Sequence, residues 1–369
     1  MGLFNFFKKK QNDIKITSTA ISHTPTPKDF ANERVQAIKE ITKLRSSCYP
    51  SSNGLYPDEI MLLSYAPKYM TANNKFPAFW ATSYGISNPQ RALQQLCTKG
   101  FIRIATAEES LNALKATKLK ELLEGFGLPS SGNKKALIAR LTENATETAI
   151  NKIITERYYV LTPLGEQELK SNEYVVYMHK HSSSLGISVW DLNKILHSSR
   201  NMNYKDAVWR ELNRRYITVA KSISDNSLYS NADGVGILIT MSDFLIEENR
   251  YDPALSPLSQ AAFYSINNQN AVSYKNYSSV SDKKTSYYEF LRFSPYYSKK
   301  FIDICMELNL SYPDLRQKLI DNMKVLPIRY QILTAQQTAD FIIAEISGDT
   351  RTAQSICQTA EKQIKRNIL

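Results

Sequence analysis

The segment 111–141, LNALKATKLKELLEGFGLPSSGNKKALIARL, constrains the fold most strongly. Its leucines recur at helical spacing in two separate stretches, which we call the two leucine repeats. In the first repeat, three leucines at helical spacing predict one buried helix face: Leu119, Leu122 and Leu123. Thr117 can cap the start of this helix. Gly125 and Gly127 are expected to end it before a turn at Leu128 and Pro129. The first repeat therefore predicts a short helix that needs an apolar partner.

The second repeat supplies that partner. Ser130 or Ser131 can cap a second helix, whose apolar residues share one face: Leu137, Ile138 and Leu141. The two repeats together predict a helical hairpin. Its core is small, which places it near the lower size limit for a segment that folds alone.

The start of the second predicted helix contains the groups that favour a bound anion: Gly132, Asn133, Lys134 and Lys135. The first backbone N–H groups of a helix have no partner within the helix, and the positive end of the helix dipole attracts negative charge. Two lysines at this end oppose the dipole unless something negative binds there. Segment 110–146 has three glutamates against a larger basic set: Lys115, Lys118, Lys120, Lys134, Lys135 and Arg140. A basic hairpin exposed to solvent is the alternative interpretation.

Residues of about 110–146, a tenth of the chain, resemble the SAP domain. The matching positions occur in the family's order: Leu119, Leu122, Leu123, Gly127, Leu128, Pro129, Ser131, Gly132, Lys134, Leu137, Ile138, Arg140 and Leu141. The resemblance implies binding to double-stranded DNA with weak sequence preference, often for AT-rich tracts. It also implies that Ser131, Gly132 and Lys134 approach the DNA backbone. With the neighbouring polar and basic side chains, the predicted DNA-binding set of this segment is Lys118, Ser131, Gly132, Asn133, Lys134, Lys135 and Arg140.

The residues before this segment predict a helix followed by a strand. Asn88 is a capping residue and Pro89 suits the first helical position, so a helix is expected over residues 88–99, ended by Gly100. Its inward side chains are expected to be Leu93, Leu96 and Cys97, and its outward ones Gln90, Arg91, Gln94 and Gln95. Strand patterns follow at residues 101–104 and, after the SAP-like segment, at 157–161.

This order of elements resembles a winged helix, with helix 88–99 as the recognition helix and the two strands as the wing. The SAP-like segment lies wholly between the strands, so we expect it to be an insertion in the wing, where hairpin tips tolerate insertions. Arg and Gln side chains read base edges, which makes Arg91, Gln94 and Gln95 candidate DNA contacts. Winged helices also act as protein-interaction modules, and that alternative stays open.

The charge of the chain favours an acidic partner. Its 369 residues include 46 Lys and Arg against 35 Asp and Glu, a formal charge of +11. Such an excess fits nucleic acid or an anionic membrane surface. The sequence has no apolar run long enough to span a membrane. We therefore expect double-stranded DNA as the partner and no membrane span.

Catalytic, metal and cofactor motifs are absent from the sequence. The four cysteines are far apart and form no CxxC pair, so we expect free thiols in a reducing cytoplasm: Cys48, Cys97, Cys305 and Cys357. His179 and His181, expected near the end of a strand, have no carboxylate or cysteine beside them. The glycines form no phosphate-binding loop, and no acidic cluster suggests a two-metal nuclease. We expect no metal, no cofactor and no enzymatic activity.

The expected domains are a tail and helix (1–53), a winged-helix-like domain (54–182) with the SAP insertion (110–146), and a helical domain (183–369). Within the first, a helix is expected from Asp29 to about Arg45, and the start MGLFNFFKKK could contact a membrane or a partner. Within the last, Pro257 is expected to begin a new helix, and the Tyr-, Ser- and Asn-rich stretch 264–288 is expected to be a long loop.

The sequence thus predicts a mainly α fold with a small β component and a DNA-associated, cytoplasmic, non-catalytic protein. The helical domain would bind a protein partner or a second copy of the chain. The main alternative is a protein-interaction scaffold that its SAP segment tethers to DNA, and an enzyme is the third possibility. The order of segments also resembles uncharacterised SAP-containing proteins of bacteria and prophages, which assigns no process.

Overall fold

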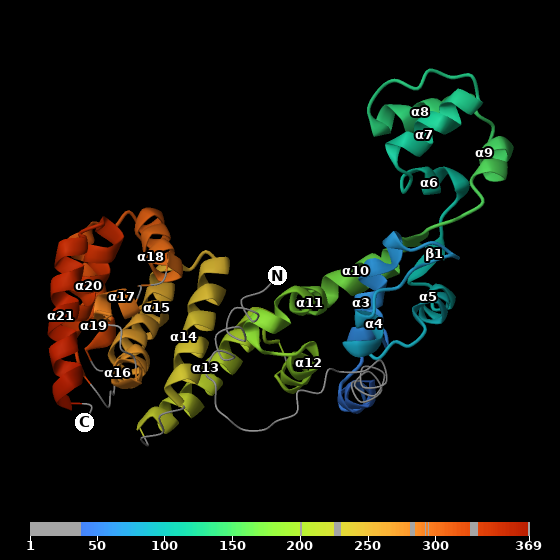
Figure 1. Cartoon of the computed structure of the whole chain (residues 1–369). Helices are drawn as coiled ribbons and strands as arrows, with labels where there is room; N and C mark the ends of the chain where they lie inside the picture. The colour runs from blue at the N-terminus through green and yellow to red at the C-terminus, as the bar shows by residue number, and fades with distance from the viewer. Residues whose placement is uncertain are drawn as a thin grey trace. The chain divides into compact units, whose positions relative to one another are not determined.

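The structure is a computed structural model that describes residues 38–199, 201–224, 230–280, 285–291, 293, 295–324 and 331–367. It is mainly helical with a small β component, as predicted, and the chain divides into two compact units, Met1–Asn172 and Glu173–Leu369 (Figure 1). Residues 38–46 are helical, which agrees with the end of the helix expected from Asp29. The segment MGLFNFFKKK and residues 29–37 lie outside the described residues.

The first unit begins with helices that pack on a short hairpin. These elements are α3 (Pro57–Tyr65), η1 (Ala66–Lys68), α4 (Phe79–Thr82), α5 (Pro89–Thr98), β1 (Ile102–Ile104), β2 (Tyr159–Leu161) and α10 (Pro163–Ser171). The start of α5 is as predicted, since the Asn88 side chain accepts a hydrogen bond from the Arg91 backbone N–H. Thr162 caps α10 in the same way by accepting from the Gly165 N–H. Leu93 and Leu96 are buried and form the face of α5 that packs into the core.

The two predicted strands pair with each other. β1 and β2 run antiparallel, with Arg103 opposite Val160, and Met70 forms an additional antiparallel bridge with Tyr158. The backbone N–H of Ala105 donates to the carbonyl of Tyr158 at 2.8 Å. The segment between Ala105 and Tyr158 therefore begins and ends at the same end of the hairpin.

The segment between the strands is a subdomain of four helices, not the two that the leucine repeats predict. They are α6 (Ala107–Leu111), α7 (Ala116–Gly125), α8 (Lys134–Asn144) and α9 (Glu147–Ile153), which lie together in Figure 1. Their shared core consists of Ala107, Leu111, Leu119, Leu123, Leu137, Leu141, Ile150 and Ile154. The outer helices complete the core that the central hairpin alone lacks.

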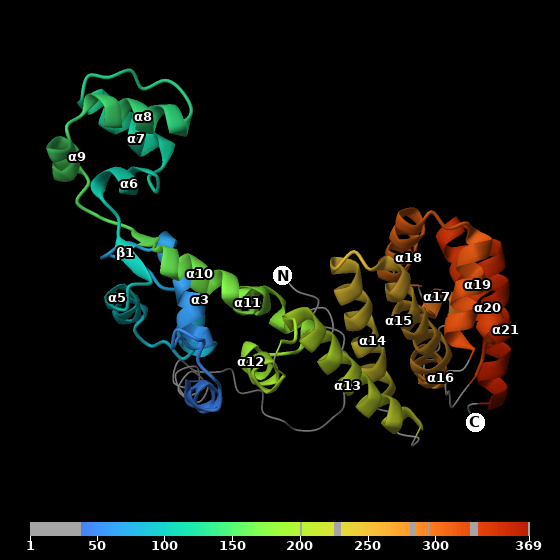
Figure 2. The ribbon, with the colours of Figure 1, turned by 180° about the vertical axis from the view of Figure 1, so that it is seen from behind.

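The second unit consists of helices from α11 to α21. They are α11 (Glu173–Leu185), α12 (Val189–Ser198), α13 (Tyr204–Ser224), α14 (Ser230–Glu247), α15 (Tyr251–Tyr264), η2 (Ser265–Gln269), α16 (Asn270–Val280), α17 (Tyr287–Leu291), α18 (Pro295–Leu308), α19 (Tyr312–Met323), α20 (Ala335–Ser347) and α21 (Thr350–Asn367). Helix α14 packs between α13 and α15, and α20 packs against α19 and α21 (Figure 2).

Two predictions for this unit are wrong. Helix α15 continues through Pro257 instead of restarting there, because Pro257 and its neighbours are buried against other helices, which offsets the lost N–H donor. The stretch expected to be a loop contains the end of α15, a π-helical turn and α16. Two of its asparagines are part of the core, Asn267 and Asn268. Asn267 donates to the Phe263 carbonyl and accepts from the Leu333 N–H.

The histidines expected near a strand end lie instead in α11. His181 Nδ1 is 2.8 Å from the Tyr177 carbonyl one turn earlier, and its ring stacks on that of Tyr177. Among the described residues, no group of three or more His, Cys, Asp or Glu side chains could hold a metal ion. The four cysteines are free thiols. In the same part of the chain, no helix is both long and apolar enough to cross a membrane.

Candidate nucleic-acid interface

The start of α8 is an exposed helix terminus with backbone donors available. Asn133, rather than Ser130 or Ser131, is the capping residue, and its Oδ1 accepts from the Ala136 N–H at 3.0 Å. The N–H groups of Lys134 and Lys135 have no hydrogen-bond acceptor among the described residues. Gly132 precedes the cap with φ of 120°, a conformation that other residues rarely adopt. The sequence therefore builds a terminus that can accept an anion.

The start of α8 lies beside the residue that ends α6, Asn112. Lys134 Nζ donates to the backbone carbonyl of Asn112 at 2.7 Å, a few residues before α7. Lys115, not Thr117, occupies the capping position of α7, and no side chain caps this helix. Lys115 at the start of α7 and Lys135 at the start of α8 are both exposed. Neither Lys115 nor Lys135 makes an ion pair within the described residues, so their charges are not neutralised there.

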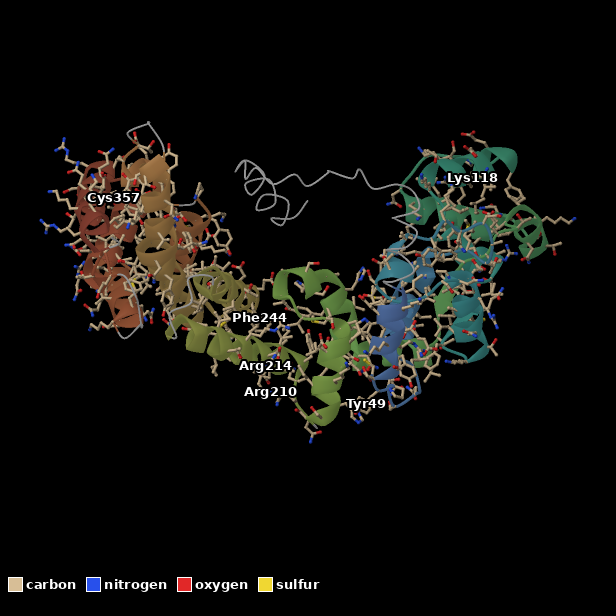
Figure 3. The ribbon with its side chains drawn as sticks, turned by 60° about the horizontal axis from the view of Figure 1, so that its bottom comes forward. Tyr49, Lys118, Arg210, Arg214, Phe244 and Cys357 are labelled. Atoms are coloured by element: carbon tan, nitrogen blue, oxygen red, sulfur yellow. The ribbon has the colours of Figure 1, made fainter. Side chains whose placement is uncertain are left out.

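The remaining predicted contacts of this segment have partners within the subdomain. Lys118, labelled in Figure 3, is exposed on α7 and forms an ion pair with Glu121 at 3.0 Å. Arg140 donates from one guanidinium nitrogen to the carbonyls of Pro129 and Ser131, the latter at 2.9 Å. Ser131 and Gly132 are exposed in the loop that Arg140 holds. The structure thus brings residues 131–135 together at the start of α8. Arg140 contacts the loop that contains Ser131, and Lys118 lies on the neighbouring helix α7.

An ion pair joins the subdomain to strand β1. Arg103 on β1 contacts both carboxylate oxygens of Glu109 on α6, at 2.7 and 2.6 Å. Glu109 also accepts from the backbone N–H of Thr106, in a capping box that begins α6. These contacts, led by the Arg103 hydrogen bonds, lower the pKa of the Glu109 carboxyl to about 2, so the pair stays charged at neutral pH.

Helix α5 presents a second polar surface. Arg91, Gln94 and Gln95 are exposed on one side of it, and their side chains make no hydrogen bond with a described residue. The prediction that Gln90 faces outward is wrong. Its side chain bonds the Thr71 carbonyl and the Tyr159 hydroxyl and accepts from Asn74, which ties α5 to the hairpin. The α5 residues belong to a different element from the α8 terminus.

Sequence reasoning missed two features around the α8 site. Asn112 supplies the carbonyl that Lys134 contacts, and α6 and α9 supply half of the core. A signal for α6 exists in the sequence, since Thr106 and Glu109 have the spacing of a capping box. Thr146 similarly caps α9 through the Ala149 N–H. Nothing in the sequence pairs Lys134 with Asn112.

Comparison with known protein families finds a match, and it lies within this subdomain. Residues 110–145 match the family model of the SAP domain. The comparison with curated proteins gave no match, and neither did the comparison with solved structures. The resemblance to bacterial and prophage proteins stays a prediction. Residues 110–145 therefore form a SAP domain, and its presence indicates that the chain binds nucleic acid.

Proposed function

We propose that this protein binds double-stranded DNA and that the start of α8 in the SAP domain holds the phosphate backbone. The observation that carries the proposal is the α8 terminus, where two backbone N–H groups lack an acceptor among the described residues beside the exposed Lys135. Backbone donors and lysines at a helix start are the groups that hold phosphate. They carry no base information, so this contact is expected to be largely independent of DNA sequence.

We further propose that the rest of the first unit is a winged-helix-like domain with the SAP domain inserted in its wing. Supporting this are the order of α3, α4, α5, β1 and β2, and the bridge from Met70 to Tyr158, which adds a third strand-like segment beside β2. The close approach of Ala105 to Tyr158 makes the insertion point a hairpin tip. In this proposal α5 is the recognition helix.

The exposed side chains of α5 would then read sequence. Arg and Gln can each bridge two base-edge atoms, a contact that discriminates between bases by about 1–3 kcal/mol. We expect Arg91→Ala to reduce preference among DNA sequences, whereas lysine substitutions at the α8 start lower all affinities together. Selection of binding sites from a randomised duplex pool measures this with each variant. Enrichment of nothing beyond AT content by the unaltered protein would refute base reading by α5.

The second unit is proposed to contact a protein partner or a second copy of the chain, in the cytoplasm and without a catalytic role. Ile302 and Met306 support this, because they lie four residues apart on α18 and are both exposed. If the protein is instead a scaffold that DNA merely tethers, substitutions in the SAP domain will remove DNA binding and leave its protein contacts intact.

The test of DNA binding is a salt titration with Lys134 and Lys135 changed to alanine together. Each phosphate contact contributes about 0.9 to the slope of log affinity against log salt, so two lost contacts lower it by about 1.8. We expect affinity for duplexes of any sequence to fall about tenfold or more at moderate salt. Fluorescence anisotropy with labelled duplexes measures both quantities.

The matched control removes two charges elsewhere. Lys299 and Lys365 are exposed in the second unit, where each forms an ion pair with a carboxylate on an adjacent turn of its own helix. Their double alanine variant has the same net charge as the test variant and is expected to bind as the unaltered protein does. An equal loss in both variants would mean that net charge, not the α8 terminus, holds the DNA.

A further inference from the structure

Arg140 faces the loop before α8 rather than the outside of the subdomain. It is the seventh residue of α8, and helical side chains tilt toward the N-terminus of their helix. Its Nη1 reaches the carbonyls of Pro129 and Ser131, two loop residues that precede the helix cap. A charged donor that serves two carbonyls makes stronger hydrogen bonds than a neutral one.

The loop that Arg140 contacts has few other anchors. Leu128 N–H donates to the Leu123 carbonyl at its beginning, and Ser130 Oγ donates to Glu124 at 3.0 Å. Pro129 has no N–H to donate, and Ser131 and Gly132 are exposed. Arg140 therefore holds the loop from the α8 side, whereas Glu124 holds it from the α7 side.

We propose that Arg140 is a positioning residue that fixes the Pro129–Ser131 loop, and with it the backbone donors at the start of α8, in the conformation that accepts a DNA phosphate. The proposal rests on the function proposed above and replaces the sequence prediction that Arg140 itself contacts DNA. It follows from the orientation of the Arg140 guanidinium, which points at two loop carbonyls. These carbonyls are hydrogen-bond acceptors and therefore need a donor.

The charge of Arg140 and its geometry can be separated by substitution. Arg140→Lys keeps the positive charge, but an ammonium is a point donor that lacks the fixed fork of a guanidinium. Arg140→Met keeps an apolar stem and removes the charge. A positioning role predicts that both variants weaken duplex binding about tenfold, the effect of losing charge-assisted hydrogen bonds. Both should leave the slope of log affinity against log salt within about 0.3 of the unaltered value, since no phosphate contact of a cation is lost.

Lys135→Met is the matched control on the same helix, because Lys135 is exposed and has no ion-pair partner among the described residues. It should lower the salt slope by about 0.9, as a direct phosphate contact does. The same salt titrations of the full chain with one AT-rich duplex compare all three variants. Full affinity in Arg140→Lys, together with a slope lowered by about 0.9 in Arg140→Met, would overturn the positioning role and make Arg140 a direct contact.

A measurement on the free protein separates this inference from the proposed function. Rigid backbone has an NMR order parameter near 0.85 and flexible backbone one below about 0.6. We expect the amides of Ser131 and Gly132 to be rigid in the unaltered chain and in Lys135→Met, and to become flexible in Arg140→Met. Unchanged order parameters in Arg140→Met would refute the positioning role. If the loop loosens as expected but the unaltered chain binds no duplex, Arg140 positions the loop and DNA binding is what fails.

Discussion

Replacing Gly165 with alanine is expected to destabilise the first unit strongly, because α10 begins in contact with the backbone before β1. A Cβ at position 165 would lie 2.1 Å from the carbonyl oxygen of Phe101 and 3.1 Å from its carbon. Neither atom can move independently, since Phe101 leads into the paired strand β1. The helix start itself is fixed by Thr162, whose hydroxyl donates to the Gly100 carbonyl at 2.7 Å.

The expected loss in unfolding free energy for Gly165→Ala is about 3 kcal/mol, at the upper end for overpacked sites. Thermal melting of the full chain by circular dichroism measures it. Gly125→Ala is the control in the same unit, because a Cβ at the end of α7 meets nothing within 4 Å. That variant should change stability by less than about 1 kcal/mol. Equal melting of Gly165→Ala and the unaltered chain would show that α10 can shift away from Phe101.

The features predicted correctly from the sequence are those set by local chemistry. The helix start at Asn88 and Pro89 follows from capping preferences, and the leucine repeats place Leu119 and Leu137 in a core. The pairing of β1 with β2 follows from the winged-helix resemblance, since the strands are far apart in sequence. Such pairing cannot be deduced from either strand alone.

The features that sequence reasoning missed depend on tertiary contacts. Arg140 is a basic residue on a polar helix face, so its sequence context cannot distinguish a phosphate contact from a contact with its own loop. Gln90 has the same ambiguity and turns inward. In stretch 264–288, tyrosines and asparagines are typical of loops, yet buried Tyr264 and Asn267 pack in the second unit's core. The partners of Arg140, Gln90 and Asn267 include residues distant in sequence, such as Tyr159 for Gln90 and Leu333 for Asn267.

Removing the SAP subdomain should abolish most DNA binding and leave the rest of the first unit folded. The subdomain core lies wholly between Ala107 and Ile154, so the removed segment must extend past Ile154, to residue 155. Ala105 and Tyr158 are already hydrogen-bonded neighbours, and a short Gly-Ser turn can join the strands as in other hairpins. The Arg103–Glu109 ion pair is lost, but it is exposed, and such pairs contribute about 1 kcal/mol at most.

The most direct test of DNA binding by the SAP domain is the duplex affinity of the full chain with residues 107–155 replaced by that turn. We expect this protein to keep a cooperative thermal transition and to bind duplex DNA at least about 100-fold more weakly at moderate salt, with a shallower salt dependence, because the phosphate contacts of α8 are gone. A folded deletion protein that binds duplex DNA as tightly as the unaltered chain would contradict the account and place the DNA site outside the SAP domain.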